Sequence, residues 1–278
     1  MVIDGVMLLW FGLTALAVLF VAIDIRDTPE SAVMKWGFVL FTLYAGPFGA
    51  FLYVLGCREP FPGTHERYVD ARWRQVLGST MHCVAGDGIG ILVGAVIGAV
   101  IALPILADLG LEYVLGFGFG WTIFQALFMR DMAGGDYGKS LRMTFMSEFL
   151  SMNCLMGGMI VVSTLAWKGV AAAHDPLQPL FWFRMSVALM AGFVIAYPMN
   201  WWLVAHHLKH GMTTVRPATA GDGMSGMKMD EGSAAGGTNM AEMKPPSPRP
   251  PVPVMAVISV AVLAIGLLIA SAFGGVSG

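Results

Sequence analysis

The residues best suited to chemistry stand close together at positions 81–87. His82, Cys83 and Asp87 place an imidazole, a thiol and a carboxyl within about one and a half helical turns, with Cys83 and Asp87 on one face. These groups are ligands of transition metals. They could equally form a thiol–imidazole redox or proton site. A third interpretation is a polar helix start near the lipid headgroups, with Asp87 paired to a neighbouring helix.

A second pattern combines a carboxylate with thioethers. Glu148, Met152, Met156 and Met159 fall at i, i+4, i+8 and i+11, which predicts one stripe along a helix. Thioethers below a carboxylate suit a path for a soft cation such as Cu(I). Methionine also fills cores, and packing is the favoured interpretation of the stripe alone. Glu148 is different, because a carboxylate within an apolar run needs a partner.

Histidines and methionines follow the run that ends near residue 206. His206 and His210 are four apart, a spacing that can chelate one metal on a helix. The alternative is a polar interfacial end, with the neighbouring Trp201 and Trp202 in the aromatic belt. The segment beyond is rich in methionine, as in copper-handling proteins: Met212, Met224, Met227, Met229, Met240 and Met243.

The elements that must position these residues are expected to be membrane-spanning helices. The chain of 278 residues is 56% hydrophobic and only 12% charged, too few charges to cover a water-facing surface. Long apolar runs lie near 5–24, 34–56, 83–107, 110–129, 142–167, 180–206 and 253–273. Runs of this length predict helices, not barrel strands. The expected fold is an all-α polytopic transmembrane bundle of about seven spans.

Composition divides the chain into five parts. We expect a two-helix unit at 1–56, a cytoplasmic linker with an amphipathic helix at 57–81, a four-helix core at 82–211, a disordered linker at 212–252 and a last helix at 253–278. Glycines at 86, 90, 94 and 98 predict close packing of two helices in lipid. Gly116, Gly118 and Gly120 repeat the theme in the next run.

Basic residues predict an orientation. With seven spans, one side holds only Arg26, Lys35, Lys168 and Arg184, and the other side holds Arg58, Arg67, Arg72, Arg74, Arg130, Lys139, Arg142, Lys209, Arg216, Lys228, Lys244 and Arg249. Lysine and arginine accumulate on the cytoplasmic side. The N-terminus is therefore expected in the cytoplasm and the C-terminus outside. Glu112 and Arg184 would then lie at the extracytoplasmic face, where they could pair as a structural clamp.

Three stretches resemble a known family of bacterial membrane proteins, Domain of Unknown Function 4396 (DUF4396). They are Met-His-Cys-Val-Ala-Gly-Asp at 81–87, the aromatic and glycine stretch at 117–129, and Tyr-Pro-Met-Asn-Trp-Trp-Leu at 197–203. The resemblance covers about 77–212 and implies a helical module of the inner membrane with no assigned activity. Some relatives carry a second cysteine where this chain has Asp87, which disfavours a dithiol redox site here.

The patterns together predict a protein that binds or transports a transition-metal cation, copper above all. The expected metal ligands are His82, Cys83, Asp87, Glu148, Met152, Met156, Met159, His206 and His210. The alternatives are a membrane thiol or quinone redox protein and a non-catalytic subunit or assembly factor of a membrane complex. No Walker A loop or hydrolase motif occurs. The expected partners are the lipid bilayer and a metal donor or another membrane protein, not nucleic acid.

Overall fold

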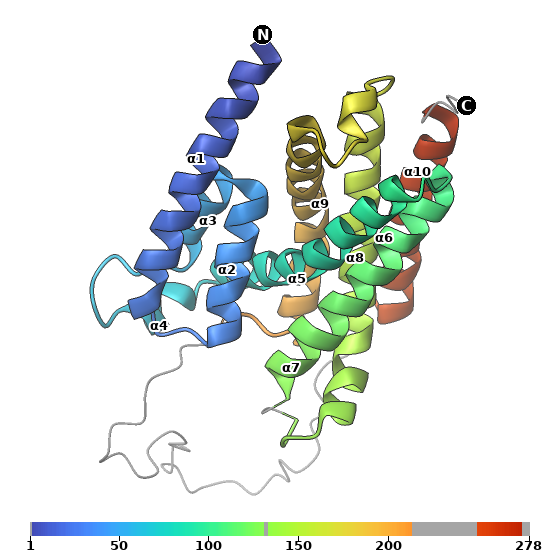
Figure 1. Cartoon of the computed structure of the whole chain (residues 1–278). Coiled ribbons are helices and arrows are strands. Elements are labelled where there is room, and N and C mark those ends of the chain that lie inside the picture. Colours follow the sequence, from blue (N-terminus) through green and yellow to red (C-terminus); the bar gives the residue numbers. More distant parts are fainter. Residues whose placement is uncertain (1, 131–132, 213–248, 274–278) are drawn as a thin grey trace, which may run out of the picture.

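The structure, a computed structural model, describes residues 2–130, 133–212 and 249–273, and every element in these ranges is a helix (Figure 1). In chain order the elements are α1 (Val2–Asp24), η1 (Ile25–Asp27), α2 (Ala32–Ala45), α3 (Pro47–Gly56), α4 (His65–Val69), α5 (Arg72–Val100), α6 (Ile105–Phe119), η2 (Gly120–Gln125), α7 (Ala126–Met129), α8 (Tyr137–Ala166), η3 (Ala171–Ala173), α9 (Pro179–Ala205) and α10 (Val252–Phe273). The predicted all-α polytopic bundle is confirmed.

Six helices in these ranges are long and apolar enough to cross a membrane. They are α1, α5, the continuous segment formed by α6, η2 and α7, and then α8, α9 and α10. The remaining predicted span, the second along the chain at 34–56, is instead two shorter helices, α2 and α3, of 14 and 10 residues. A helix needs about 20 residues to span the hydrocarbon layer, so neither crosses it alone.

Helices α2 and α3 form a hairpin that turns at Gly46. Gly46 has φ +58°, a conformation that residues with a side chain rarely adopt. A Cβ on Gly49 would lie only 2.6 Å from Cα of Thr42. Two residues seven apart in a straight helix are separated by about 10 Å, so α3 folds back against α2. The predicted single span over 34–56 is therefore wrong.

Helix α5 is the central element and packs against α2, α6 and α9. It begins at Arg72, well before the predicted start at 83, and so includes the last part of the predicted linker, whereas α4 (His65–Val69) is a separate short helix. Cys83 consequently lies about three turns inside α5, not at a helix start. The predicted close packing between the glycine-rich helices is present, because a Cβ on Gly90 would overlap the backbone of Leu115 in α6.

Helix α10 packs along one side of α8. The backbones meet at Gly157 and Gly266, where a Cβ on Gly266 would lie 2.9 Å from the carbonyl oxygen of Gly157. Asn153 donates a hydrogen bond to Ser259 at 3.2 Å. Much of the remaining surface of α10 is apolar and exposed, as a lipid-facing span requires. Residues 213–248 of the predicted linker lie outside the described residues.

The ends of the chain lie at the same end of the bundle (Figure 1). If the six sufficiently long apolar helices of the described residues each cross once, α1 and α10 end on one side, whereas the seven predicted crossings put the termini on opposite sides. The connections before α2, before α5 and before α8 lie at the other end of the molecule (Figure 1). The difference from the sequence prediction comes entirely from the α2–α3 hairpin.

Candidate metal centre

Three potential metal ligands converge inside the bundle. Cys83 and Asp87 come from α5 and Glu148 from α8, and one ligand atom of each lies within 4.8 Å of the other two. Sγ of Cys83 is 3.2 Å from Oε2 of Glu148 and 3.8 Å from Oδ2 of Asp87. All three side chains are buried. The structure therefore brings together three of the predicted ligands from two helices.

A lysine occupies the position that a cation would take beside the thiol. Nζ of Lys209 donates to Sγ of Cys83 at 3.0 Å and to Oδ1 of Asn200 at 2.8 Å, and it lies 3.9 Å from Oε2 of Glu148. Asn200 also donates to Oγ of Ser151 at 2.9 Å. The ammonium is buried with the acidic groups, so each charge in this cluster needs its neighbours.

The segment that carries Lys209 folds back over the start of α5. Helix α9 ends at Ala205, and His207 adopts φ +57°, which reverses the chain direction. Met212 then packs against Gly78, where a Cβ would overlap its side chain. These contacts hold the lysine over Cys83, although the two residues are 126 positions apart.

A π-helical segment makes room for the two carboxylates. Helix α6 changes into the π-helix η2 at Gly120, the point nearest the cluster. A Cβ on Gly120 would overlap Oδ1 of Asp87 and lie 2.6 Å from Oε1 of Glu148. Single π-helical turns are frequent at functional sites. Here the irregular turn brings bare backbone against the carboxylates.

Two carboxylate oxygens of the cluster have no hydrogen-bond partner outside it among the described residues, and the Asp87 and Glu148 carboxyl groups lie against each other. The two oxygens are Oδ1 of Asp87 and Oε1 of Glu148, and both are buried. Buried carboxylate oxygens are normally paired, because desolvation without a partner is costly. Both face Gly120, as the close approach described above shows. Carboxylate oxygens without an outside partner, beside a thiol, fit a site that accepts a further cation.

His82, also a predicted ligand, points away from this cluster. Its ring packs against Phe124 and Phe128, with ring centroids 5.3 Å and 5.2 Å away. It also lies close to α2, because a Cβ on Gly37 would be 3.3 Å from Cα and from Cδ2 of His82. Adjacent residues on a helix point about 100° apart, so His82 and Cys83 face different neighbours. Its Nε2 is buried without a hydrogen-bond partner in the structure.

His206 and His210 do not form the predicted pair on one helix face. Helix α9 ends at Ala205, so the helical spacing on which that prediction rests is not present. The ring of His206 packs against that of Trp202 at an interplanar angle of 40°, and its Nδ1 lies 2.9 Å from the carbonyl oxygen of Trp202. His210 lies in a small surface pocket beside Asp70, and burial lowers its pKa.

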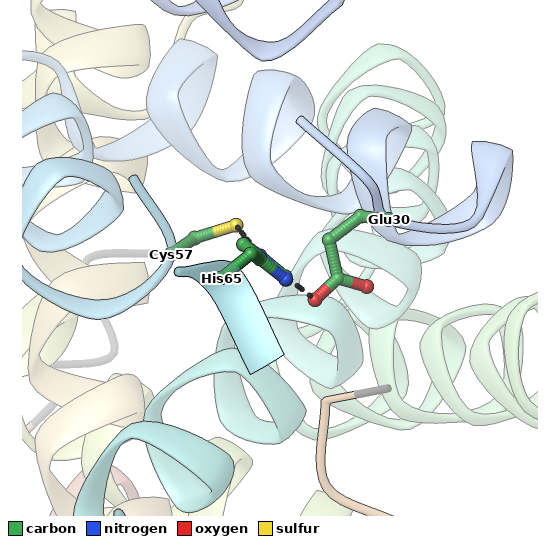
Figure 2. Close-up of side chains that lie close together, drawn as sticks. All are labelled: Glu30, Cys57 and His65. Carbon is green, nitrogen blue, oxygen red and sulfur yellow. Dashed lines mark hydrogen bonds and ion pairs between the residues drawn. The ribbon is translucent and has the colours of Figure 1, made fainter. Parts of the chain in front are cut away.

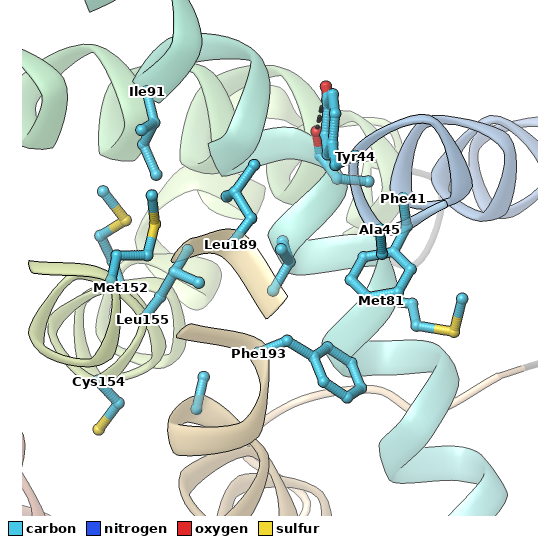
Figure 3. Close-up of a cluster of buried hydrophobic side chains, with 14 of the residues drawn as sticks. Phe41, Tyr44, Ala45, Met81, Ile91, Met152, Cys154, Leu155, Leu189 and Phe193 are labelled. Carbon is cyan, nitrogen blue, oxygen red and sulfur yellow. Dashed lines mark hydrogen bonds between the residues drawn. The ribbon is translucent and has the colours of Figure 1, made fainter. Parts of the chain in front are cut away.

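The methionine stripe lies in the apolar core and connects two polar regions. The side chains of Met152, Met156 and Met159 are all buried, and Figure 3 shows Met152 within the apolar core. A Cβ on Gly116 would lie 2.7 Å from Cε of Met152 and 3.3 Å from the carbonyl oxygen of Asp87. Eleven residues further along α8 from Glu148, about 16 Å at helical rise, Met159 lines a cavity at the other end.

That cavity has a volume of about 780 Å³ and is charged. Its lining includes Asp108, Glu112, Lys168, His174 and Arg184. The guanidinium of Arg184 donates to Nδ1 of His174 at 2.8 Å. Glu112 and Arg184 thus share one polar region, as expected, but the hydrogen bond of Arg184 goes to a histidine that the sequence did not single out.

Ser151, Asn200 and Lys209 are parts of the centre that the sequence patterns did not identify. Asn200 had a signal, since it stands in the Tyr-Pro-Met-Asn stretch at 197–200. Ser151 is three residues after Glu148 and so shares its helix face. Lys209 had no such signal, because it follows the end of α9 and is indistinguishable in sequence from an ordinary interfacial lysine.

Comparison with known proteins gives one match. A protein-family model described as Domain of unknown function (DUF4396) matches residues 72–209, which contain every member of the Cys83 centre. The match begins at the first residue of α5 and ends at Lys209. No curated protein and no solved structure matches the chain.

Proposed function

Residues 72–209 belong to the DUF4396 family, and from this premise we propose that the chain binds a transition-metal cation at Cys83, Asp87 and Glu148. The observation that carries the proposal is the burial of one thiol and two carboxyls within ligand distance of one another, with two carboxylate oxygens that have no hydrogen-bond partner outside this group among the described residues. Thiol and carboxylate together suit borderline transition metals better than Mg²⁺ or Ca²⁺.

The charge of the cluster favours a divalent ion. With Asp87 and Glu148 ionised and Lys209 protonated, the cluster carries one negative charge, and loss of the Cys83 proton makes it two. A divalent cation neutralises this set, which a buried site requires. Copper, predicted from the methionines, stays a candidate ion, and the thiolate–carboxylate set adds Zn²⁺ as a second one.

The methionine stripe supports movement of the ion as well as its binding. Met156 lies between Met152, beside the centre, and Met159, at the cavity. A cation that enters the charged cavity would meet a line of thioethers on its way to Cys83. Soft donors of this kind suit Cu(I), so copper would use the stripe while Zn²⁺ would not.

The proposal also includes an orientation in the membrane. The end of the bundle at which α9 ends also carries the connection from α3 to α5 (Figure 1), and the basic residues of these segments are Arg58, Arg67, Arg72, Arg74 and Lys209. Lys168 belongs to the connection between α8 and α9 and lines the cavity. The positive-inside rule then places Lys209 toward the cytoplasm and the cavity toward the outside of a bacterial inner membrane. Both termini are extracytoplasmic in this arrangement.

The direct test is metal analysis of the detergent-purified protein after loading with Zn²⁺ or copper and desalting. Cys83→Ser, Asp87→Asn and Glu148→Gln should each lower the bound metal by about one equivalent. Cys154→Ser is the matched control, because Cys154 is also a buried cysteine of α8 but does not belong to the cluster of ligand groups. Metal uptake into proteoliposomes should fall in the same three variants.

An unchanged metal content in a folded Cys83→Ser protein would overturn the proposal. Folding is judged by a single symmetric peak in size-exclusion chromatography. His82→Ala should keep its metal, because His82 faces Phe124 and Phe128. Loss of metal in His82→Ala with retention in Cys83→Ser would move the site to the other face of α5.

One contact favours a second candidate function, thiol chemistry at Cys83. The ammonium of Lys209 at 3.0 Å stabilises a negative charge on the sulfur. However, all three cysteines are buried and none forms a disulfide bond. Neither Cys57 nor Cys154 belongs to this cluster. A redox cycle would therefore need a small-molecule thiol or quinone as partner. Rapid alkylation of Cys83 by a small maleimide, with no bound metal, would favour this candidate.

A further inference from the structure

A second group of metal-ligand side chains lies outside the DUF4396 region. Glu30 precedes α2, Cys57 is the C-cap of α3, and His65 opens α4. Figure 2 shows the three side chains pointing toward one another, with the imidazole between the thiol and the carboxylate. Nε2 of His65 lies 3.9 Å from Sγ of Cys57 and 3.7 Å from Oε1 of Glu30. One ligand atom from each lies within 4.8 Å of the other two.

All three side chains are buried, and the carboxylate has few polar contacts. His65 and Glu30 expose 2% and 0% of their side chains, and Cys57 is fully buried. Within the described residues, neither Oε1 nor Oε2 of Glu30 makes a hydrogen bond of ordinary geometry, although the backbone of Ser31 stabilises the carboxylate. Burial of a carboxylate with so little compensation is costly, so a cation beside it would stabilise the group.

We propose that Glu30, Cys57 and His65 form a second site for a divalent transition metal, of the Zn²⁺ class, which holds the base of the α2–α3 hairpin. The ligand types are those of zinc sites, with one sulfur, one imidazole nitrogen and one carboxylate oxygen. A thiolate and a carboxylate carry two negative charges, which a divalent ion neutralises without a further protein charge.

The place of the site in the fold indicates a structural role. It joins the connection after α1, the end of α3 and the short helix α4, three segments with little regular structure between them. An apolar hairpin that does not cross the membrane needs its two ends fixed, and a metal bound to both ends does this. Structural zinc sites contribute directly to folding free energy. The site shares no residue with the Cys83 centre and does not rest on the function proposed above.

The test uses Co²⁺ as the probe in full-length protein that carries Cys83→Ser, so that the first centre has no thiolate. Cobalt bound to a thiolate gives an intense charge-transfer absorption, and in this protein the band should persist at about one equivalent. Adding Cys57→Ser should abolish the band, whereas adding Cys154→Ser, the control, should leave it unchanged. Zn²⁺ should displace the cobalt and bleach the band.

Absence of a cobalt–thiolate band in folded Cys83→Ser protein would overturn this proposal, and it would leave the Cys83 centre untouched. Survival of the band after Cys57→Ser would also overturn it. Because Cys57→Ser could destabilise the fold, Glu30→Gln provides an independent variant that keeps the sulfur. It should weaken Co²⁺ binding at least tenfold and shift the band, and an unchanged titration in Glu30→Gln would count against the site.

Discussion

At the scale of single residues, Lys209 is the group that gives the Cys83 centre its character. Its ammonium contacts the sulfur and the amide oxygen of Asn200, and lies near one carboxylate. In the metal-free protein it provides the positive charge that the anionic groups need. A bound metal would have to displace it or share the anions with it. The ammonium of Lys209 would therefore compete with a metal ion for the same thiol and carboxylate groups.

Replacing this competitor should strengthen metal binding. In Lys209→Met the cluster loses a positive charge that lies 3.9 Å from Oε2 of Glu148, one of the proposed ligand groups. Two positive charges about 4 Å apart repel each other by about 4 kcal/mol at an effective dielectric constant of about 20. We expect the affinity for Zn²⁺ or copper to rise about tenfold or more, measured by competition with a chromophoric chelator. Lys139→Met, on the surface of α8, is the control. A weaker affinity in Lys209→Met would show that the lysine assists binding.

His174 predicts a pH dependence at the cavity. Its Nδ1 accepts a hydrogen bond from Arg184, which only the neutral imidazole can do, and burial together with the charge of Arg184 lowers its pKa. Asp108, Glu112 and Lys168 line the same cavity. When the pH falls below the ordinary histidine pKa of about 6.5, His174 becomes protonated in the unfolded chain while it stays neutral in the folded chain.

The sign follows from this difference in proton uptake. Where the unfolded state binds more protons, stability falls as the pH falls. The contribution of His174 is therefore present above about pH 6.5 and is lost on acidification below it. Thermal unfolding in detergent should show a lower midpoint at pH 5.5 than at pH 7.5, with a smaller difference in His174→Gln. An equal difference in both proteins would exclude His174 as the titrating group.

The residue patterns identified the centre only in part. Cys83, Asp87 and Glu148 stood out because a thiol or carboxyl inside an apolar run is costly and so needs a reason. The spacing rule gave the shared face of Cys83 and Asp87 correctly. It could not show that His82 faces aromatic rings, because that depends on which helix lies on each side of α5. Lys209 reaches the site through tertiary folding, which no local pattern reports.

At the scale of elements, the π-helix η2 decides how closely the carboxylates approach the backbone. Gly120 opens this segment, and Gly118, two residues earlier, has no atom within 4 Å of its Cβ position. Gly120→Ala would push a methyl group into Asp87 and Glu148, whereas Gly118→Ala adds one in open space. The two substitutions are chemically identical and differ only in their surroundings.

Gly120→Ala should therefore impair the metal centre without removing a ligand. Overpacking of this kind costs about 1–3 kcal/mol, and the carboxylates are the groups that must move. We expect metal content after loading to fall in Gly120→Ala and to stay at the wild-type value in Gly118→Ala. If both variants bound metal equally, the carboxylates would have room to rearrange and the close approach would not matter.

Element boundaries show where sequence reasoning succeeded and where it failed. The last three predicted spans agree closely with α8, α9 and α10, because long apolar runs bounded by polar loops leave little choice. The run over 34–56 has the same apolar composition, yet it folds back at Gly46. Gly46 is followed by Pro47, a pair typical of turns, but the prediction of a single span followed the apolar composition of the whole run and gave this pair no weight.

At the scale of the whole molecule, the hairpin determines the topology. Helices α2 and α3 enter and leave at one end of the bundle (Figure 1), and the described residues contain six helices that are long and apolar enough to cross a membrane. An even number of crossings places both ends of the chain on one side. The same arrangement gathers the basic connections between the spans at the opposite side, together with both proposed metal sites.

Labelling of single introduced cysteines tests this topology in intact cells. With the three native cysteines buried, a membrane-impermeant maleimide should react with a cysteine added at the N-terminus, with Lys168→Cys and with a cysteine added after residue 278. Arg67→Cys should react only after lysis, because basic connections stay in the cytoplasm. Each protein is compared with the unmodified chain, which measures labelling of the native thiols.

If the two termini reacted from opposite sides, the 32–56 segment would cross the membrane and the re-entrant hairpin would be wrong. If both reacted only after lysis, the hairpin would stand and the orientation would be reversed. The cavity, and not the end that carries Lys209, would then face the cytoplasm.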